Sequence, residues 1–246
     1  MPSADATSAQ VPLIVFAVPE ETKAFLKRVR PLLKAVGERE TIQFRIIERH
    51  TTEERFWPTL RVLTTGMGVE NARQAIADAL HAARPSLVLT CGFAGGLDPA
   101  LPLGALILDA DKGFPLVSTL TAAGARTGTF HCADHVAVTA AQKAALRRST
   151  GADAVEMESS VIRSACRERG IPSATVRVIS DTAGEDLPLD FNQLMTEDYR
   201  MDFLKLAGQL VRSPGKIPEL MRFQKRVSFA ADRLAETLVK ALNVGS

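Results

Sequence analysis

The chain contains short, continuously apolar runs that each end in a glycine-rich or acidic turn. Residues Val11–Val18 read VPLIVFAV, and Ser86–Cys91 forms a second run of this kind. Strands with apolar side chains at successive positions are buried on both faces, which is typical of a sheet covered by helices. Helical spacing of apolar residues appears over Thr22–Val36, after the first run, and over Val69–Ala83, between the strand expected at Leu60–Thr65 and the second run. The alternation predicts a three-layer α/β fold, with a mostly parallel or mixed central sheet and helices on both faces.

The same patterns extend along the rest of the chain. The hydrophobic fraction of 46% over 246 residues suits a single large domain, expected at residues 11–246 after a disordered N-terminus at 1–10. Residues 114–138 show a weaker pattern, which predicts short strands and loops. Further strands are expected at Thr41–Glu48, Leu60–Thr65, Gly104–Ala110, Ala152–Val155 and Ser173–Ser180, and helices at Ala140–Ser149, Glu156–Arg169 and from Gln193 onward, with breaks at 213–215 and Pro218.

Composition excludes several classes of protein. The formal net charge is +2 and Lys and Arg are not clustered, which argues against nucleic-acid binding. Cys91, Cys132 and Cys166 are far apart and form no disulfide or zinc-binding pattern. The first ten residues lack the features of a signal peptide, and no apolar run has the length of a membrane span. We expect a cytoplasmic protein.

Four segments place glycine or polar residues where predicted strands end. These segments are Pro19–Glu21, Gly66–Gly68, Gly92–Gly96 and Ser180–Asp181. Ligands of α/β sheets bind at the carboxyl ends of the strands. The coincidence therefore predicts one ligand site built from all four segments.

The glycine segments have structural as well as functional interpretations. Gly66-x-Gly68 could begin a dinucleotide-binding fingerprint, but Asn71 stands where the third glycine would be, which favours a tight strand-to-helix turn. Gly92–Gly96 contains three glycines in five residues. Such a run lets the main chain approach a ligand closely, although a crowded turn would need the same residues.

The acidic residues are equally open to two interpretations. Glu156-Met157-Glu158 is expected to open a helix, where carboxylates complement the helix dipole; a glutamate fixed there could also accept both hydroxyls of a ribose. Asp181 places an acidic residue at the end of a buried strand, where it could belong to the ligand site or simply cap a helix. Glu20 and Glu21 stand at another helix start. His131 and His135 could share a metal, but a loop or strand would separate them, so we expect no metal and no cofactor.

Taken together, the motifs resemble one family, the purine nucleoside phosphorylase and methylthioadenosine/S-adenosylhomocysteine nucleosidase superfamily. The similarity covers most of the chain up to about residue 190, and the helical tail and AGGLDP segment are most similar to the hopanoid-associated (adenosylhopane) branch. The matching stretches are AVPEE (17–21), TTGMGVENA (64–72), CGFAGGLDPALPLG (91–104), AVEMES (154–159) and RVISDTA (177–183).

The resemblance implies a role for each motif. Asp181 would be the general acid that protonates N7 of the departing purine, and Glu21 the base that activates a water. Glu158 would hold the ribose hydroxyls. The other substrate contacts implied are Met157, Gly95, Glu156, Phe93, Val136 and Ala137. The activity implied is cleavage of the purine–ribose bond of an adenosine-type nucleoside substituted at its 5′ carbon.

Water and phosphate are the alternative nucleophiles. Phe93 stands where relatives commonly have Ser, and Glu20 and Glu21 end the first strand without an Arg, so a phosphate there would be repelled. We therefore favour a nucleosidase over a phosphorylase. The third alternative is a catalytically silent nucleoside-binding protein, although binding alone would not require a general acid.

The C-terminal segment, residues 216–242, interleaves apolar side chains with Lys and Arg. Packing of this segment on the core or on a partner subunit is favoured over peripheral membrane contact. The resemblance further implies a homo-oligomer.

Overall fold

The computed structural model describes residues 11–29, 33–36, 41–46, 59–196, 205, 206, 208, 213 and 215–243, with the backbone alone for 33–36 and 41–46. The expected disordered N-terminus lies outside the described residues.

A ten-stranded mixed sheet forms the centre of the molecule. Its main path runs β2-β3-β4-β1-β5-β10-β6-β7, and β9 joins both β5 and β8. The central strands β4, β1, β5 and β10 are parallel, whereas β6 runs antiparallel to β10. The strands are β1 (Leu13–Phe16), β2 (Leu33–Val36), β3 (Thr41–Ile46), β4 (Thr59–Thr64), β5 (Val88–Gly96), β6 (Leu106–Ala110), β7 (Ala125–Thr127), β8 (Phe130–Cys132), β9 (Ala154–Glu156) and β10 (Ser173–Asp181).

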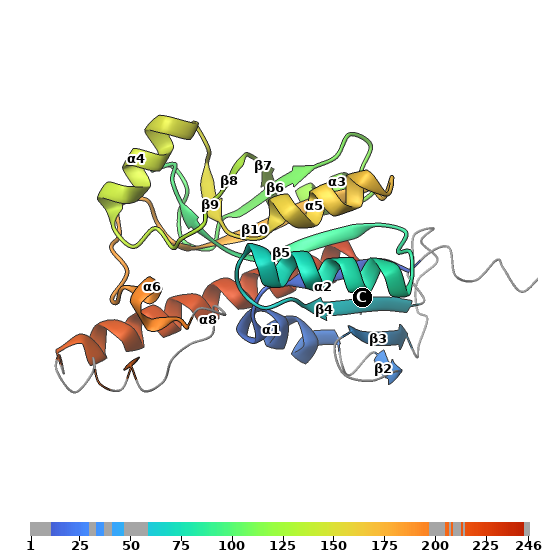
Figure 1. The fold of residues 1–246 in the computed structure, drawn as a ribbon, viewed down its shortest axis with the longest axis horizontal. Helices are drawn as coiled ribbons and strands as arrows, with labels where there is room; N and C mark the ends of the chain where they lie inside the picture. The colour runs from blue at the N-terminus through green and yellow to red at the C-terminus, as the bar shows by residue number, and fades with distance from the viewer. Residues whose placement is uncertain are drawn as a thin grey trace, which may run out of the picture.

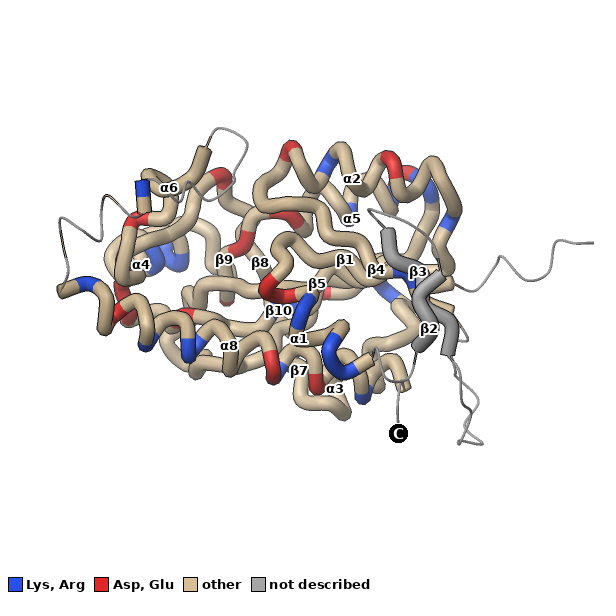
Figure 2. The backbone as a smooth tube through the Cα atoms, turned by 90° about the horizontal axis from the view of Figure 1, so that it is seen from below, with Lys and Arg blue, Asp and Glu red and all other residues tan. Residues whose placement is uncertain are grey.

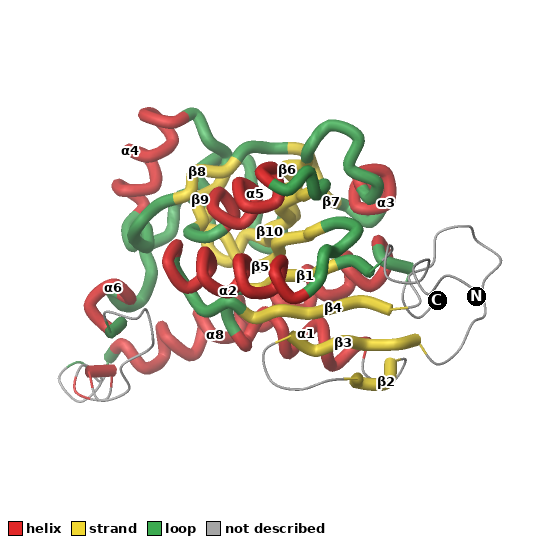
Figure 3. Tube along the Cα trace, turned by 45° about the vertical axis from the view of Figure 1, so that its right-hand side comes forward, coloured by secondary structure: helices red, strands yellow, loops and turns green. Residues whose placement is uncertain are grey.

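Helices cover both faces of this sheet, which confirms the predicted three-layer fold (Figures 1 and 3). Helices α2 and α5 pack together on one face, while α1, α3 and α8 lie on the other. The short α6 and the exposed α4 lie beyond the sheet at one end of the molecule. The helices are α1 (Pro19–Val29), α2 (Val69–Ala82), α3 (Val117–Ala122), α4 (Ala140–Thr150), α5 (Ser159–Glu168), α6 (Phe191–Leu194) and α8 (Lys216–Ala241).

Strand β1 shows why its apolar run is continuous. Leu13 and Val15 pack into the cluster under α2 and α5, and Ile14 and Phe16 pack into the cluster under α1 and α8. Successive side chains of a strand point to opposite faces, so a strand between two helical layers needs apolar residues at every position. Each such burial contributes about 1.5–3 kcal/mol relative to exposure.

Two predicted elements have different bounds in the structure. The helix expected over Thr22–Val36 ends at Val29, and Leu33–Val36 is strand β2. The sequence has a proline at position 31, and the residue before a proline is disfavoured in a helix. The strand expected to end at Cys91 continues through the glycines to Gly96, because Gly95 and Gly96 pair with β9.

Three further predictions need correction. Glu156 ends β9 and the following helix begins at Ser159, so the three residues 156–158 do not form its first turn. Pro218 does not break the final helix but lies in the first turn of α8, where no intrahelical donor is lost. The weakly patterned region 114–138 contains helix α3 as well as β7 and β8.

Helix α8 packs against α1, α3 and β10. This agrees with the prediction that the C-terminal segment packs on the core. Ile217, Met221 and Phe229 on α8 remain exposed. Among the described residues, no helix combines the length and apolarity that a membrane span requires. Basic and acidic positions are interspersed along the described backbone (Figure 2).

Candidate active site

A cavity of about 360 Å³ lies at the carboxyl ends of β1, β4, β5 and β10. All four segments predicted to form a ligand site contribute to its wall. The nine residues predicted from the sequence line it together: Glu21, Phe93, Gly95, Val136, Ala137, Glu156, Met157, Glu158 and Asp181. Their chemical roles stay predictions, but residues from distant parts of the chain converge on one hollow of nucleoside size.

Glu21, in the first turn of α1, is held in the cavity wall by main-chain donors. Its Oε2 accepts hydrogen bonds from the N–H groups of Ala17 (3.0 Å) and Val18 (3.1 Å), and its Oε1 accepts one from Phe93 N–H at 2.7 Å. Burial raises the pKa of Glu21 to about 7, although the nearby Arg177 guanidinium and these hydrogen bonds oppose the rise. A carboxyl with this pKa can both lose and accept a proton near neutral pH.

Gly92 is required because side chains converge on its Cα. A Cβ at this position would stand 2.5 Å from Glu21 Oε1 and still closer to the Arg177 guanidinium. The glycine therefore allows a carboxylate from α1 and a guanidinium from β10 to meet across β5.

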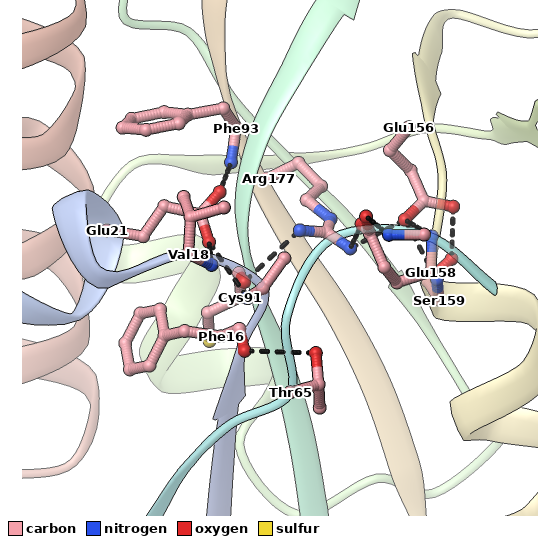
Figure 4. A network of polar contacts seen from close by, with 12 residues as sticks. Phe16, Val18, Glu21, Thr65, Cys91, Phe93, Glu156, Glu158, Ser159 and Arg177 are labelled. Atoms are coloured by element: carbon pink, nitrogen blue, oxygen red, sulfur yellow. Dashed lines mark hydrogen bonds and ion pairs between the residues drawn. The ribbon is translucent and has the colours of Figure 1, made fainter. Parts of the chain in front are cut away.

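Arg177 joins the carboxylates of the site, as Figure 4 shows. Its guanidinium is 1% exposed and contacts Glu156 Oε2 at 2.6 Å and Glu158 Oε2 at 3.3 Å. It also donates to the main-chain oxygen of Cys91 at 3.2 Å. A buried charge is tolerated when it is paired and hydrogen-bonded, and Arg177 meets both conditions.

The two glutamates beside Arg177 differ in their environments. Glu156 accepts hydrogen bonds from the N–H groups of Glu158 and Ser159 and from the Ser159 hydroxyl. Burial alone would raise the pKa of Glu156, but Arg177 and these donors lower it. Glu158 accepts a hydrogen bond from the main-chain N–H of Gly68 at 3.0 Å. Burial raises the pKa of Glu158, the neighbouring Glu156 adds to this, and Arg177 opposes it.

These contacts separate the two interpretations of the 156–158 segment. Glu156 satisfies the N–H groups at the start of α5, so its carboxylate is occupied by the protein although it lines the cavity. Glu158 makes no side-chain capping bond to α5 and has acceptor capacity left for a ligand. The two carboxylates therefore differ in what the protein already asks of them: Glu156 caps the start of α5, whereas Glu158 can accept further hydrogen bonds.

Asp181 ends β10 and does not cap a helix. Its Oδ1 accepts a hydrogen bond from the Ser180 hydroxyl at 2.7 Å, and its Oδ2 pairs with the ammonium of Lys143 from α4. Both Asp181 and Ser180 line the cavity. The carboxyl is therefore fixed at the cavity wall by contacts to both of its oxygens.

Apolar side chains form another part of the cavity wall. They come from the loop before α6, from α6 and the residue that follows it, and from α8, and they are Leu187, Phe191, Met195, Phe223 and Val227. The rings of Phe191 and Phe223 pack with their centroids 5.6 Å apart. Val136 is tied to this wall because its N–H and C=O groups both bond the Asn192 side chain.

The glycines after β4 support the turn interpretation. Gly66 and Gly68 have φ values of 85° and 90°, a region that favours glycine. Gly68 then serves the site by donating its N–H to Glu158. His131 lies on β8 and His135 lines the cavity, and the residues that the structure describes contain no cluster of metal-binding side chains.

Sequence reasoning missed Arg177 and Lys143. An arginine within the apolar strand 173–180 is a signal that could have identified Arg177, since charged residues are rarely buried without a partner. Lys143 lies in a polar helix with no comparable signal. The statement that the first strand brings no Arg is true of the sequence, but β10 supplies one in space.

Comparison with known proteins places these features in context. The model of the phosphorylase superfamily matches residues 13–111 and 116–212. A curated relative, the 5′-methylthioadenosine/S-adenosylhomocysteine nucleosidase of Geobacillus kaustophilus, is 29% identical over 54% of this chain and 72% of its own length. The enzyme of the same name from Geobacillus thermodenitrificans is 28% identical over 54% and 71%.

Solved structures show the same fold. The futalosine hydrolase of Helicobacter pylori has a TM-score of 0.67 at 17% identity, covering 96% of this chain and 98% of that chain. The 5′-methylthioadenosine/S-adenosylhomocysteine nucleosidase of Helicobacter pylori, complexed with a pyrrolopyrimidine-substituted pyrrolidinol, also has a TM-score of 0.67 at 17% identity, covering 96% of this chain and 99% of that chain. At this identity the likeness shows the fold.

Proposed function

The chain belongs to the phosphorylase superfamily, and we propose that it is an N-glycosidase that hydrolyses the purine–ribose bond of an adenosine-type nucleoside. The observation that carries the proposal is the convergence of Glu21, Glu158 and Asp181 on one cavity. The names of the curated relatives, nucleosidases for 5′-methylthioadenosine and S-adenosylhomocysteine, support the same reaction.

Asp181 is the general acid in this proposal. The base leaves with the electron pair of its bond to C1′, so a proton on N7 makes it a better leaving group. Asp181 lies at the cavity wall with its carboxyl oriented by Ser180 and Lys143. Asp181 therefore donates the proton while the sugar acquires oxocarbenium character.

Glu21 and Glu158 act on the sugar. A pKa of about 7 lets Glu21 accept a proton from the attacking water near neutral pH. Glu158 retains acceptor capacity beyond its bonds to Gly68 and Arg177, so it binds ribose hydroxyls. The negative charge of the two side chains also stabilises the cationic sugar in the transition state.

Water is favoured over phosphate by the charges around the cavity. Glu21, Glu156 and Glu158 face one guanidinium, Arg177, which is buried and already bonded to Glu156, Glu158 and Cys91. A phosphate beside these carboxylates would meet repulsion without a free cationic partner in the described wall. The phosphorylase remains the second candidate because the family's name and the common fold permit it.

The 5′ substituent is proposed to be apolar. The wall formed by Leu187, Phe191, Met195, Phe223 and Val227 offers no charge, and burying an apolar group there is favourable. Among the candidate types, methylthioadenosine and adenosylhopane carry such a substituent, whereas S-adenosylhomocysteine carries a charged amino-acid group and is the less favoured of the three. We further propose that residues 11–246 form one domain and that the protein is a cytoplasmic homo-oligomer.

An assay of base release tests the proposal. Purified protein is incubated with methylthioadenosine, S-adenosylhomocysteine, adenosine and inosine, with and without phosphate. Free adenine in both conditions is the expected result. Release that requires phosphate would establish the phosphorylase, and tight binding of nucleoside without release would establish the silent binding protein.

A further inference from the structure

Lys143 is the buried residue of α4, a helix whose other side chains are exposed or half-buried. It is 0% exposed. Burial of an ammonium is costly unless the charge is paired and each of its protons has an acceptor. The buried position of the Lys143 ammonium must therefore be explained by the groups that it contacts.

All three protons of the Lys143 ammonium have acceptors. Nζ donates to the main-chain oxygens of Thr182 and Glu185, each at 2.9 Å, and it pairs with Asp181 Oδ2. The two carbonyl groups fix the ammonium and supply no charge. The Asp181 carboxyl is the acidic group of the pair, and its other oxygen accepts a hydrogen bond from the Ser180 hydroxyl.

We propose that Lys143 is a positioning residue that acts through Asp181 and favours the release of its proton to the departing base. This inference rests on the proposed function, because it assigns the control of the general acid. The ammonium stabilises the carboxylate that remains once the proton has gone to the base, and it orients Oδ2.

The proposed hydrolysis conserves both protons and charge. Before cleavage Asp181 is neutral, Lys143 is cationic and Glu21 is anionic. The O–H bond of Asp181 breaks as the N7–H bond forms, the C1′–N9 pair goes to the base, water bonds to C1′ and its proton goes to Glu21. Afterwards Asp181 is anionic beside cationic Lys143, Glu21 is neutral, and the summed charge is unchanged.

Other charged groups surround the pair. Glu185 accepts hydrogen bonds from the Thr182 N–H and hydroxyl and pairs with Arg226 of α8, so its charge is balanced separately. The remaining titratable or charged side chains of the cavity wall are Glu20, Glu21, His135, Glu156 and Glu158, and Arg177 lies behind them. Lys143 is the cation in direct contact with Asp181 in the described structure.

The test compares Lys143→Met, which removes the charge, with Lys143→Arg, which keeps it. An opposite charge nearby shifts a carboxyl's titration by about 1–3 pH units. The pH profile of kcat/KM depends on one acid and one base, so its optimum moves by half of a shift in either group. We therefore expect the optimum to rise by about 0.5–1.5 pH units in Lys143→Met. In Lys143→Arg, which keeps the charge, we expect the optimum to stay in place. An unmoved optimum in Lys143→Met would overturn the proposal.

Thr182→Val is the matched control, because it removes a hydrogen bond to Glu185 within the same loop and leaves the ion pair intact. It is expected to lower Tm without moving the pH optimum. An equal movement of the optimum in Thr182→Val would assign the effect to the loop rather than to the charge and would also overturn the proposal.

A second measurement does not depend on turnover. Lys143→Met leaves the buried Asp181 carboxyl without the cation that contacts it. An unpaired buried carboxylate is costly, so removing the cation should cost more stability wherever the carboxyl is ionised. The Tm deficit of Lys143→Met relative to wild type is expected to grow between pH 5 and pH 8, even if no nucleoside is cleaved. A deficit that is the same at both pH values would show that Lys143 is a packing residue.

Discussion

Replacement of Glu21 by Gln tests the electrostatic description of the site most quantitatively. Glu21 is 4% exposed, and burial raises its pKa to about 7 from an ordinary value of 4.5. One pKa unit corresponds to 1.36 kcal/mol, so ionising Glu21 costs the folded state about 3 kcal/mol. Gln cannot ionise and avoids this cost.

The stability of the protein depends on pH because Glu21 binds its proton more tightly in the folded than in the unfolded chain. Between pH 4.5 and about 7 the folded protein keeps a proton on Glu21 that the unfolded chain has released. The contribution of this residue to stability is therefore full below pH 4.5 and is lost as pH rises through 7. Wild type should lose stability relative to Glu21→Gln across this window, by up to about 3 kcal/mol.

Denaturant unfolding at pH 5, 6, 7 and 8 measures the difference. Gln retains one acceptor for three main-chain donors, so Glu21→Gln is expected to start less stable at pH 5 and to approach or pass wild type by pH 8. Activity should fall by about 10²–10⁴-fold because the base is lost. A stability difference that does not change with pH would refute the desolvation argument.

Three further substitutions extend the test. Asp181→Asn should lower kcat at least ~100-fold while nucleoside binding persists, as steady-state kinetics and calorimetry would show; near-normal kcat would contradict the acid role. Glu158→Gln should weaken binding of ribonucleosides by about 1.5–3 kcal/mol, the value of hydrogen bonds to a charged group, but affect 2′-deoxy analogues less; equal losses for both would exclude contact with the 2′-hydroxyl. Gly92→Ala should lower Tm and activity together because its Cβ would meet Glu21 and Arg177, and an unchanged Tm would show that the site can relax.

The sequence predicted the layers and the location of the site because both depend on local patterns. Continuous apolar runs identified the central strands, and polar or glycine residues at their ends marked the cavity rim. The bounds of individual elements were harder to predict. Glu156 belongs to β9 rather than to a helix because its neighbours pair with β5 and β8, a long-range effect that no local pattern carries.

The electrostatic partners were the least predictable part of the site. Arg177 is 86 residues from Cys91 and about 20 from the glutamates, and its role depends on β10 lying beside β5. Lys143 reaches Asp181 from a helix with an otherwise polar surface. Charges that meet through tertiary packing become visible when the fold is known, whereas the family motifs already contained Glu21, Glu158 and Asp181.

The identity of the sugar product tests the central claim most directly. The experiment incubates methylthioadenosine with wild-type protein in saturating phosphate, separates the products and identifies them by mass spectrometry. If Glu21 activates water beside a sugar held by Glu158, the products are adenine and free methylthioribose. A sugar 1-phosphate as the main product, or intact nucleoside after prolonged incubation with excess protein, would contradict the account.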